Sequence, residues 1–168
     1  MKQDWKIQPV QGLAAIAAIR GLMEEYWNSF GFTPCFQNFG EELAGLPGAY
    51  APPGGGLAQA LAEGQPVGCI AFRRVDDKRA EAKRLYVRPA WRGRGIGHAL
   101  LEWVIAEARS AGYAELTGDT MPVMTGALAL YRRMGFEISY AGAAAPAGQP
   151  AALLPQLPQE PILLRLRL

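Results

Sequence analysis

The fold of this 168-residue chain is decided by the stretch RLYVRPAWRGRGIGHALL, Arg84–Leu101. It opens in a predicted strand that stops at Pro89, because proline cannot donate a hydrogen bond to a sheet ladder. A turn rich in glycine and arginine follows, and helical spacing of apolar residues begins at Gly97. Glycines let backbone amides crowd around a ligand, and a helix N-terminus adds unpaired N–H groups. The stretch therefore predicts a turn that binds the pyrophosphate of a ligand.

Two common phosphate-binding patterns do not match this turn. The dinucleotide pattern G-x-G-x-x-G fails because His98 stands where the third glycine belongs. The P-loop pattern fails because no G-K-[ST] follows the glycines. The turn alone would suit any phosphorylated ligand, so the flanking segments have to identify it.

The charge distribution also indicates a single anionic ligand. The formal net charge is only +2, which gives no reason to expect a nucleic-acid or membrane partner. A long polyanion would require an extended basic face. The basic residues are instead concentrated within twelve residues that contain no acid, and they are Lys83, Arg84, Arg88, Arg92 and Arg94.

Alternating apolar and polar runs predict one α/β domain over residues 1–168. The expected strands cover residues 6–9, 57–62, 66–74, 81–87, 114–117, 137–140 and 162–168. The expected helices run from about 12 to 30, 36 to 43, 97 to 111 and 122 to 134. Residues 141–160 are rich in alanine and proline and are expected to form a long loop between the last two strands.

The ends and the cysteines bear on location and metals. The first residues lack the apolar core of a signal peptide, and no apolar stretch has the length of a membrane span. Cys35 and Cys69 are too few for a disulfide framework or a metal site. We interpret Cys69, inside an apolar run, as a buried small side chain. A cytoplasmic protein without a metal is the expectation.

The flanking motifs resemble those of the GCN5-related N-acetyltransferase (GNAT) superfamily. Arg92-Gly93-Arg94-Gly95-Ile96-Gly97 fits that family's [RQ]-x-x-G-x-[GA] loop at every fixed position. Lys83–Pro89 looks like the strand that leads into the loop. Asp119–Phe136 resembles the family's later helix motif through Ala127, Leu130-Tyr131 and Gly135-Phe136. Several motifs in the right order are more specific than one glycine loop.

The resemblance implies a mixed, twisted sheet of six to seven strands flanked by about four helices, with a parallel strand pair that splays apart. It also implies direct transfer of an acetyl group from acetyl-coenzyme A to a primary amine in a ternary complex. A non-catalytic acyl-coenzyme A sensor on the same fold is the alternative function. A homodimer is compatible with either function. The residues implied to bind the donor are Leu85, Tyr86, Val87, Arg92, Gly93, Arg94, Gly95, Ile96, Gly97 and Tyr131.

Two residues correspond to catalytic groups of the family. Tyr131 matches the tyrosine that commonly protonates the leaving thiolate, although its place on an apolar helix face also suits a core aromatic. Glu81 stands where several members carry a carboxylate base. Strand alternation predicts Glu81, Lys83, Leu85 and Val87 on one face, so an ion pair between Glu81 and Lys83 is equally compatible with the sequence.

Other positions are less specific. His98 stands in the first turn of a helix, where a surface or phosphate-side role is favoured over a base. Met124 departs from the family, in which an asparagine there often bonds the pantetheine arm. Tyr26, Trp27, Phe36 and Phe39 offer apolar walls for the acceptor, and Glu24, Glu25, Glu41 and Glu42 offer charges that attract an amine. A core role for these aromatics and a solvated face for these acids is the alternative.

Overall fold

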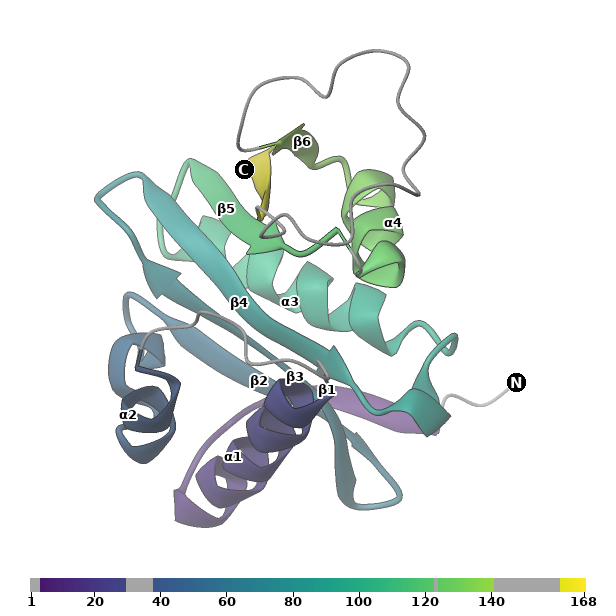
Figure 1. Cartoon of the computed structure of the whole chain (residues 1–168). Helices are drawn as coiled ribbons and strands as arrows, with labels where there is room; N and C mark the ends of the chain where they lie inside the picture. The colour runs from purple at the N-terminus through teal and green to yellow at the C-terminus, as the bar shows by residue number, and fades with distance from the viewer. Residues whose placement is uncertain (1–3, 30–37, 123, 141–160) are drawn as a thin grey trace.

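A seven-stranded mixed sheet runs through the part of the chain that the computed structural model describes, residues 4–29, 38–122, 124–140 and 161–168. Only β4 and β5 pair in parallel, and the other neighbours described are antiparallel. The predicted α/β fold with a mixed sheet and a parallel pair is confirmed (Figure 1). The spatial order is β1 (Trp5–Pro9), β2 (Gly56–Ala62), β3 (Gln65–Arg74), β4 (Arg79–Val87), β5 (Glu115–Thr120), β7 (Ile162–Arg167) and β6 (Glu137–Tyr140).

Helices cover both faces of this sheet. On one face lie α1 (Leu13–Asn28) and α2 (Phe39–Ala44), which enclose a core around Met23, Leu43 and Cys69. On the other lie α3 (Ile96–Ser110) and α4 (Thr125–Arg133). Two short 3₁₀ helices, η1 (Gly48–Tyr50) and η2 (Pro89–Trp91), occupy connections. Figure 1 shows the two helix pairs on opposite sides of β4.

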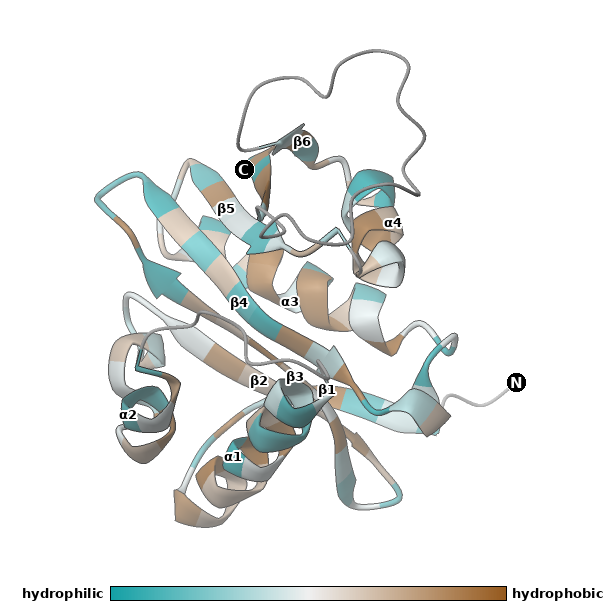
Figure 2. Cartoon of the chain, in the orientation of Figure 1, coloured by the Kyte–Doolittle hydropathy of each residue, from teal (hydrophilic) through white to brown (hydrophobic). Residues whose placement is uncertain are grey.

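The larger core lies between α3 and the sheet. α3 carries apolar residues at helical spacing, and Leu100, Leu101 and Val104 are fully buried against Ile70 and Leu116 of the strands. Figure 2 shows these apolar segments of α3 as brown bands on the ribbon. Each such side chain contributes on the order of 2 kcal/mol by leaving water. This packing fixes the N-terminus of α3 relative to the end of β4.

The sequence misplaced several element boundaries. The helix expected from Pro122 begins at Thr125, because the backbone N–H of Met124 donates to Met121 in a turn that precedes it. The strand expected to stop at Thr117 continues to Thr120, where it pairs with β7. Phe36 and the loop expected at residues 141–160 lie outside the described residues.

A bulge in β4 corrects the predicted side-chain alternation. Tyr86 pairs with Cys69 and Lys83 pairs with Ala71, so two β4 residues oppose the single Ile70. Arg84, one of those two, has a φ of 61°. Glu81 and Lys83 therefore lie on the face of α1 and α2. Leu85 and Val87 pack into the core of the α3 face, so the prediction that all four residues share one face was wrong.

No helix in the described ranges is both long enough and apolar enough to cross a membrane.

Candidate active site

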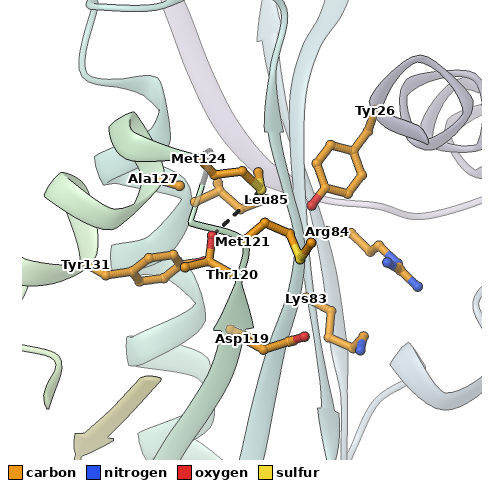
Figure 3. A pocket seen from close by; sticks show the side chains of 11 residues that line it. Tyr26, Lys83, Arg84, Leu85, Asp119, Thr120, Met121, Met124, Ala127 and Tyr131 are labelled. Carbon is orange, nitrogen blue, oxygen red and sulfur yellow. Dashed lines mark hydrogen bonds between the residues drawn. The ribbon is translucent and has the colours of Figure 1, made fainter. Parts of the chain in front are cut away.

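A pocket opens where β4 and β5 diverge. The two strands pair over only three positions, from Arg79 opposite Glu115 to Glu81 opposite Thr117, and then separate. Beyond that point Ala82–Leu85 of β4 and Asp119–Met121 at the end of β5 line opposite walls (Figure 3). Since a splayed parallel pair exposes strand backbone on both sides of a gap, an elongated ligand can enter between the strands.

One side of the pocket is closed by Met124, which immediately precedes α4, and by Ala127 and Tyr131 of that helix. Tyr131 is buried, and its ring meets Phe136 edge-on with the centroids 5.1 Å apart. Burial raises the pKa of its phenol well above the ordinary value, and the nearby Tyr26 and Asp119 raise it further. The Tyr131 phenol therefore stays protonated at neutral pH and can donate a hydrogen bond. Met124 accepts a hydrogen bond from the Thr120 hydroxyl at 3.7 Å (Figure 3).

Helix α1 contributes Tyr26 from the opposite sheet face (Figure 3). Burial raises the pKa of Tyr26 to about 12, although the neighbouring Arg84 opposes the shift. Trp27, also predicted to line the acceptor pocket, instead stacks on Phe39 with ring centroids 4.3 Å apart. Of the predicted acceptor walls within the described residues, the structure thus brings Tyr26 to the pocket and uses Trp27 and Phe39 to pack α1 against α2.

The pocket holds one carboxylate that the sequence did not single out. Asp119 lies on β5 and is exposed, and its side chain points toward Lys83 across the gap (Figure 3). The strand was expected to end at Thr117, so Asp119 appeared to belong to a connection. Extending the two-residue alternation from Thr117 would have placed Asp119 on the same face as Glu81 and Lys83.

Glu81, the predicted base, is held in ion pairs. Arg73 Nε lies 2.8 Å from one carboxylate oxygen and Lys83 Nζ lies 3.5 Å from the other. The Glu81 side chain is only 19% exposed, and it is not one of the described residues that line the pocket. The sequence left open whether Glu81 is a catalytic base or pairs with Lys83. The structure shows the ion pair with Lys83, and Arg73 is a second partner of Glu81.

Two of the acids expected to attract an amine are also engaged by arginines. Glu25 of α1 forms a two-bond pair with Arg88 at 3.0 and 2.6 Å. Glu42 of α2 pairs in the same way with Arg84 at 3.0 and 2.5 Å. Burial would raise the pKa of Glu42, but hydrogen bonds from Arg84 and Tyr50 outweigh it and lower that pKa. The Glu42 carboxylate therefore ties α2 to β4, and the Glu25 carboxylate ties α1 to the residue that follows β4.

The glycine- and arginine-rich loop joins the end of β4 to α3. Gly93 and Gly95 have φ values of 76° and 83°, which other residues adopt only with strain. The first N–H groups of α3 have no partners within the helix, so they can receive an anion. Arg92 donates to the Val87 carbonyl at 2.8 Å, and Arg94 lies over the Trp91 ring at 4.5 Å.

The loop and the pocket share α4 as a wall. A Cβ on Gly97 would lie 3.4 Å from the Leu130 side chain and 3.9 Å from Val87. Leu130 directly precedes Tyr131, so the close approach at Gly97 fixes the start of α3 beside the pocket. An anion at the loop and a reactive group at Tyr131 would therefore belong to one extended ligand.

The remaining candidates lie apart from this geometry. His98 faces Glu102 one turn along α3, at 3.3 Å. Cys69 is fully buried, and burial raises the pKa of its thiol to about 12, which leaves it unreactive. Cys35 falls outside the described residues. Within the described ranges no three histidine, cysteine or acidic side chains form a group that could hold a metal ion.

Comparisons with known proteins agree with this geometry. The acetyltransferase (GNAT) family model matches residues 17–136. An N-acetyltransferase of Schizosaccharomyces pombe is 36% identical over 118 residues, which cover 69% of this chain and 72% of that protein. A crystal structure of an acetyltransferase from Streptococcus agalactiae superposes with a TM-score of 0.78 at 20% identity, covering 99% of this chain and all of the other.

A GNAT family acetyltransferase from Elizabethkingia anophelis, solved with acetyl-coenzyme A bound, superposes with a TM-score of 0.59 at 22% identity over 99% of this chain and 100% of that chain. At these identities the solved structures establish the fold, and the family match and the yeast relative establish the family. The chain belongs to the GNAT acetyltransferase family and is an acetyltransferase.

Proposed function

We propose that the chain transfers an acetyl group from acetyl-coenzyme A to a primary amine by direct attack in a ternary complex. The observation that carries this proposal is the pocket between the diverging β4 and β5. It brings together a protonated phenol, Tyr131, and an exposed carboxylate, Asp119. Helix α4, which carries Tyr131, also contacts Gly97 of the proposed phosphate-binding loop through Leu130. Amide formation from a thioester needs a donor for the departing sulfur and an acceptor for the amine proton.

The donor would bind along the end of β4 and the loop. In the proposed mode, Arg92–Gly97 holds the pyrophosphate through backbone amides, and Leu85, Tyr86 and Val87 border the pantetheine arm. The positive φ values at Gly93 and Gly95 and the open space around Gly93 fit such a cradle. The Val87 carbonyl now accepts a bond from Arg92. Binding would release Arg92 to the phosphates and free that carbonyl for the pantetheine amide.

Tyr131 is proposed as the hydrogen-bond donor to the leaving sulfur. Its phenol has a raised pKa because it is buried, so the hydroxyl is protonated at neutral pH. An ordinary thiol has a pKa of about 8.5, well below that of this phenol. The Tyr131 hydroxyl would therefore stabilise the departing thiolate by donating a hydrogen bond while keeping its own proton, and solvent would supply the proton that completes the free thiol.

The amine must lose a proton, and two carboxylates are candidates for accepting it. Glu81 is the residue that the family resemblance favours, but Arg73 and Lys83 hold it outside the pocket wall. Asp119 lines the pocket and is exposed. We propose Asp119 as the base, acting directly or through a water molecule, with Tyr26 as an apolar wall for the acceptor. Roles for Trp27 and Phe36 in acceptor binding remain predictions.

The test is a screen of primary amines with acetyl-coenzyme A, read as release of free thiol. The panel would include amino acids, polyamines, arylalkylamines, aminoglycosides and short peptides, with a secondary amine beside each primary one as a matched control. Amine-dependent thiol release, with the acetylated product identified by mass spectrometry, supports the proposal. Tight binding of acetyl-coenzyme A without turnover of any amine would favour the sensor instead.

A further inference from the structure

The strongest unexplained feature is the residue at the centre of the β4 bulge. Arg84 adopts a φ of 61° inside a strand, a conformation that costs energy for any residue with a Cβ. Such a conformation persists only where its surroundings hold it in place. The bulge lies in the pocket wall, since both Arg84 and Leu85 line the pocket. A bulge also leaves the backbone groups of its extra residue outside the ladder.

Side chains of α2 and η1 hold Arg84, two by direct contact and one through Glu42. Glu42 of α2 receives two hydrogen bonds from the guanidinium, at 3.0 and 2.5 Å. Tyr50 of η1 donates its hydroxyl to the same carboxylate. Phe39 lies beneath the guanidinium, with its ring centroid 5.2 Å from Cζ. The Arg84 side chain is only 6% exposed, so these contacts are shielded from solvent.

The backbone of the bulge is tied down as well. The Arg84 carbonyl accepts a hydrogen bond from the buried Cys69 thiol at 3.4 Å. Cys69 belongs to β3, on the same sheet face as Tyr86. Arg84 is therefore fixed through its side chain by α2 and η1 and through its carbonyl by β3. The same bulge contributes Arg84 and Leu85 to the pocket wall.

We propose that Glu42 and Tyr50 are positioning residues that act through Arg84, holding the bulged part of β4 in the shape that the reaction requires. We call the contacts among Glu42, Tyr50 and Arg84 the clamp. It connects α2, on one sheet face, to the strand backbone beside the expected position of the acyl group. It rests on the proposed function, because the reacting thioester is placed between β4 and β5. A misplacement of the reacting group by about 1 Å can cost a hundredfold in rate. The clamp would thus affect turnover more than affinity for the donor.

The test uses Glu42→Gln, which keeps the size of the side chain and removes its charge. The matched control is Glu115→Gln, because Glu115 also receives two bonds from one arginine, Arg165, and lies away from the pocket. Their carboxylates are similarly shielded, at 21% exposure for Glu42 and 16% for Glu115. Tyr50→Phe removes a single hydrogen bond and serves as the milder variant if Glu42→Gln does not fold.

The first readout is independent of activity. Amide hydrogen exchange followed by NMR on the ligand-free protein is expected to speed up at least about tenfold at Arg84 and Leu85 in Glu42→Gln, and less in Tyr50→Phe. It is expected to stay unchanged at Ala80 and Ala82, and throughout β4 in Glu115→Gln. Unchanged exchange at Arg84 and Leu85 would overturn the clamp, even if the protein proved not to be an amine acetyltransferase.

The second readout separates positioning from packing. With acetyl-coenzyme A and the best amine of the panel, kcat of Glu42→Gln is expected to fall between about tenfold and a hundredfold. The Kd for acetyl-coenzyme A by calorimetry is expected to stay within about twofold. Equal losses in kcat and donor affinity, or an unchanged kcat, would reduce the clamp to a structural contact. Failure of the wild-type protein to turn over any amine would instead count against the proposed function.

Discussion

The donor side and the acceptor side of this site are built in different ways. The proposed donor side is centred on one continuous segment, Arg92–Gly97, which would bind the pyrophosphate through backbone amides and whose shape depends on Gly93 and Gly95. The proposed acceptor side is assembled from side chains of α1, β4, β5 and α4, which are far apart in the sequence. The donor side can therefore be recognised from a local sequence pattern, whereas the residues of the acceptor side come together only when the chain is folded.

This difference predicts how each side responds to substitution. A backbone cradle tolerates most side-chain changes except those that alter a positive φ or place a charge among the amides. A side-chain pocket depends on single functional groups, so the loss of one changes chemistry and leaves donor binding intact. The predictions below set the two sides against each other.

The largest effect is expected from Gly95→Glu on the donor side. The change forces a φ of 83° on a residue with a Cβ and puts a carboxylate where the pyrophosphate is expected. The Kd for acetyl-coenzyme A, measured by calorimetry, is expected to rise at least about a thousandfold, since charge repulsion adds to the lost amide contacts.

The control for this change is Gly112→Glu, at the other end of α3. Gly112 has a φ of 88°, so the backbone strain is matched, and a Cβ there would meet nothing within 4 Å. Acetyl-coenzyme A affinity is expected to remain normal in this variant. Normal affinity in Gly95→Glu as well would mean that the loop does not bind the donor.

Next comes Tyr131→Phe on the acceptor side. Removing the phenol is expected to lower kcat about a hundredfold, the typical cost of losing one hydrogen-bond donor to a developing negative charge, with little change in donor Kd. Tyr113→Phe is a suitable control, because Tyr113 is also buried and donates its hydroxyl to the Gly54 carbonyl at 2.7 Å, away from the pocket. If kcat and affinity fell together in Tyr131→Phe, the residue would be a packing aromatic.

The same contrast explains how much could be predicted from the sequence. Apolar spacing identified α3 and the positions of the strands along the chain, because helices and strands bury side chains at simple periods. The loop was found because its geometry needs glycines in a fixed local pattern. The bulge at Arg84 could not be predicted, since arginine carries no signal for a positive φ. Asp119 was missed because its place in the pocket depends on where β4 and β5 separate.

A smaller effect is expected from removing the proposed base. Asp119→Asn is expected to lower kcat/KM only about tenfold, since water can replace a carboxylate in part. Glu81→Gln is the paired variant and is expected to leave kcat/KM within about twofold of the wild type, because Arg73 and Lys83 already engage this carboxylate. The reverse pattern would restore Glu81 as the base that the family resemblance favours.

The smallest expected effect is a gain in donor affinity, at a residue that lines the acceptor pocket. Met124 lines the pocket where many family members carry an asparagine that bonds the pantetheine arm. Met124→Asn is expected to tighten acetyl-coenzyme A binding about fivefold by calorimetry, the worth of one added hydrogen bond of about 1 kcal/mol. Asparagine also favours the start of a helix, and Met124 immediately precedes α4, so thermal stability without ligand must be measured in parallel.

Met124→Leu separates these contributions, because it removes the sulfur that accepts from Thr120 and keeps the apolar bulk. Leucine is expected to leave donor affinity as it is in the wild type. If asparagine raised the melting temperature without tightening the donor, its benefit would be a helix cap alone. The pantetheine arm would then pass farther from α4 than the proposed binding mode requires. Position 124 would in that case contribute nothing to donor binding, which would leave the donor side dependent on backbone groups there.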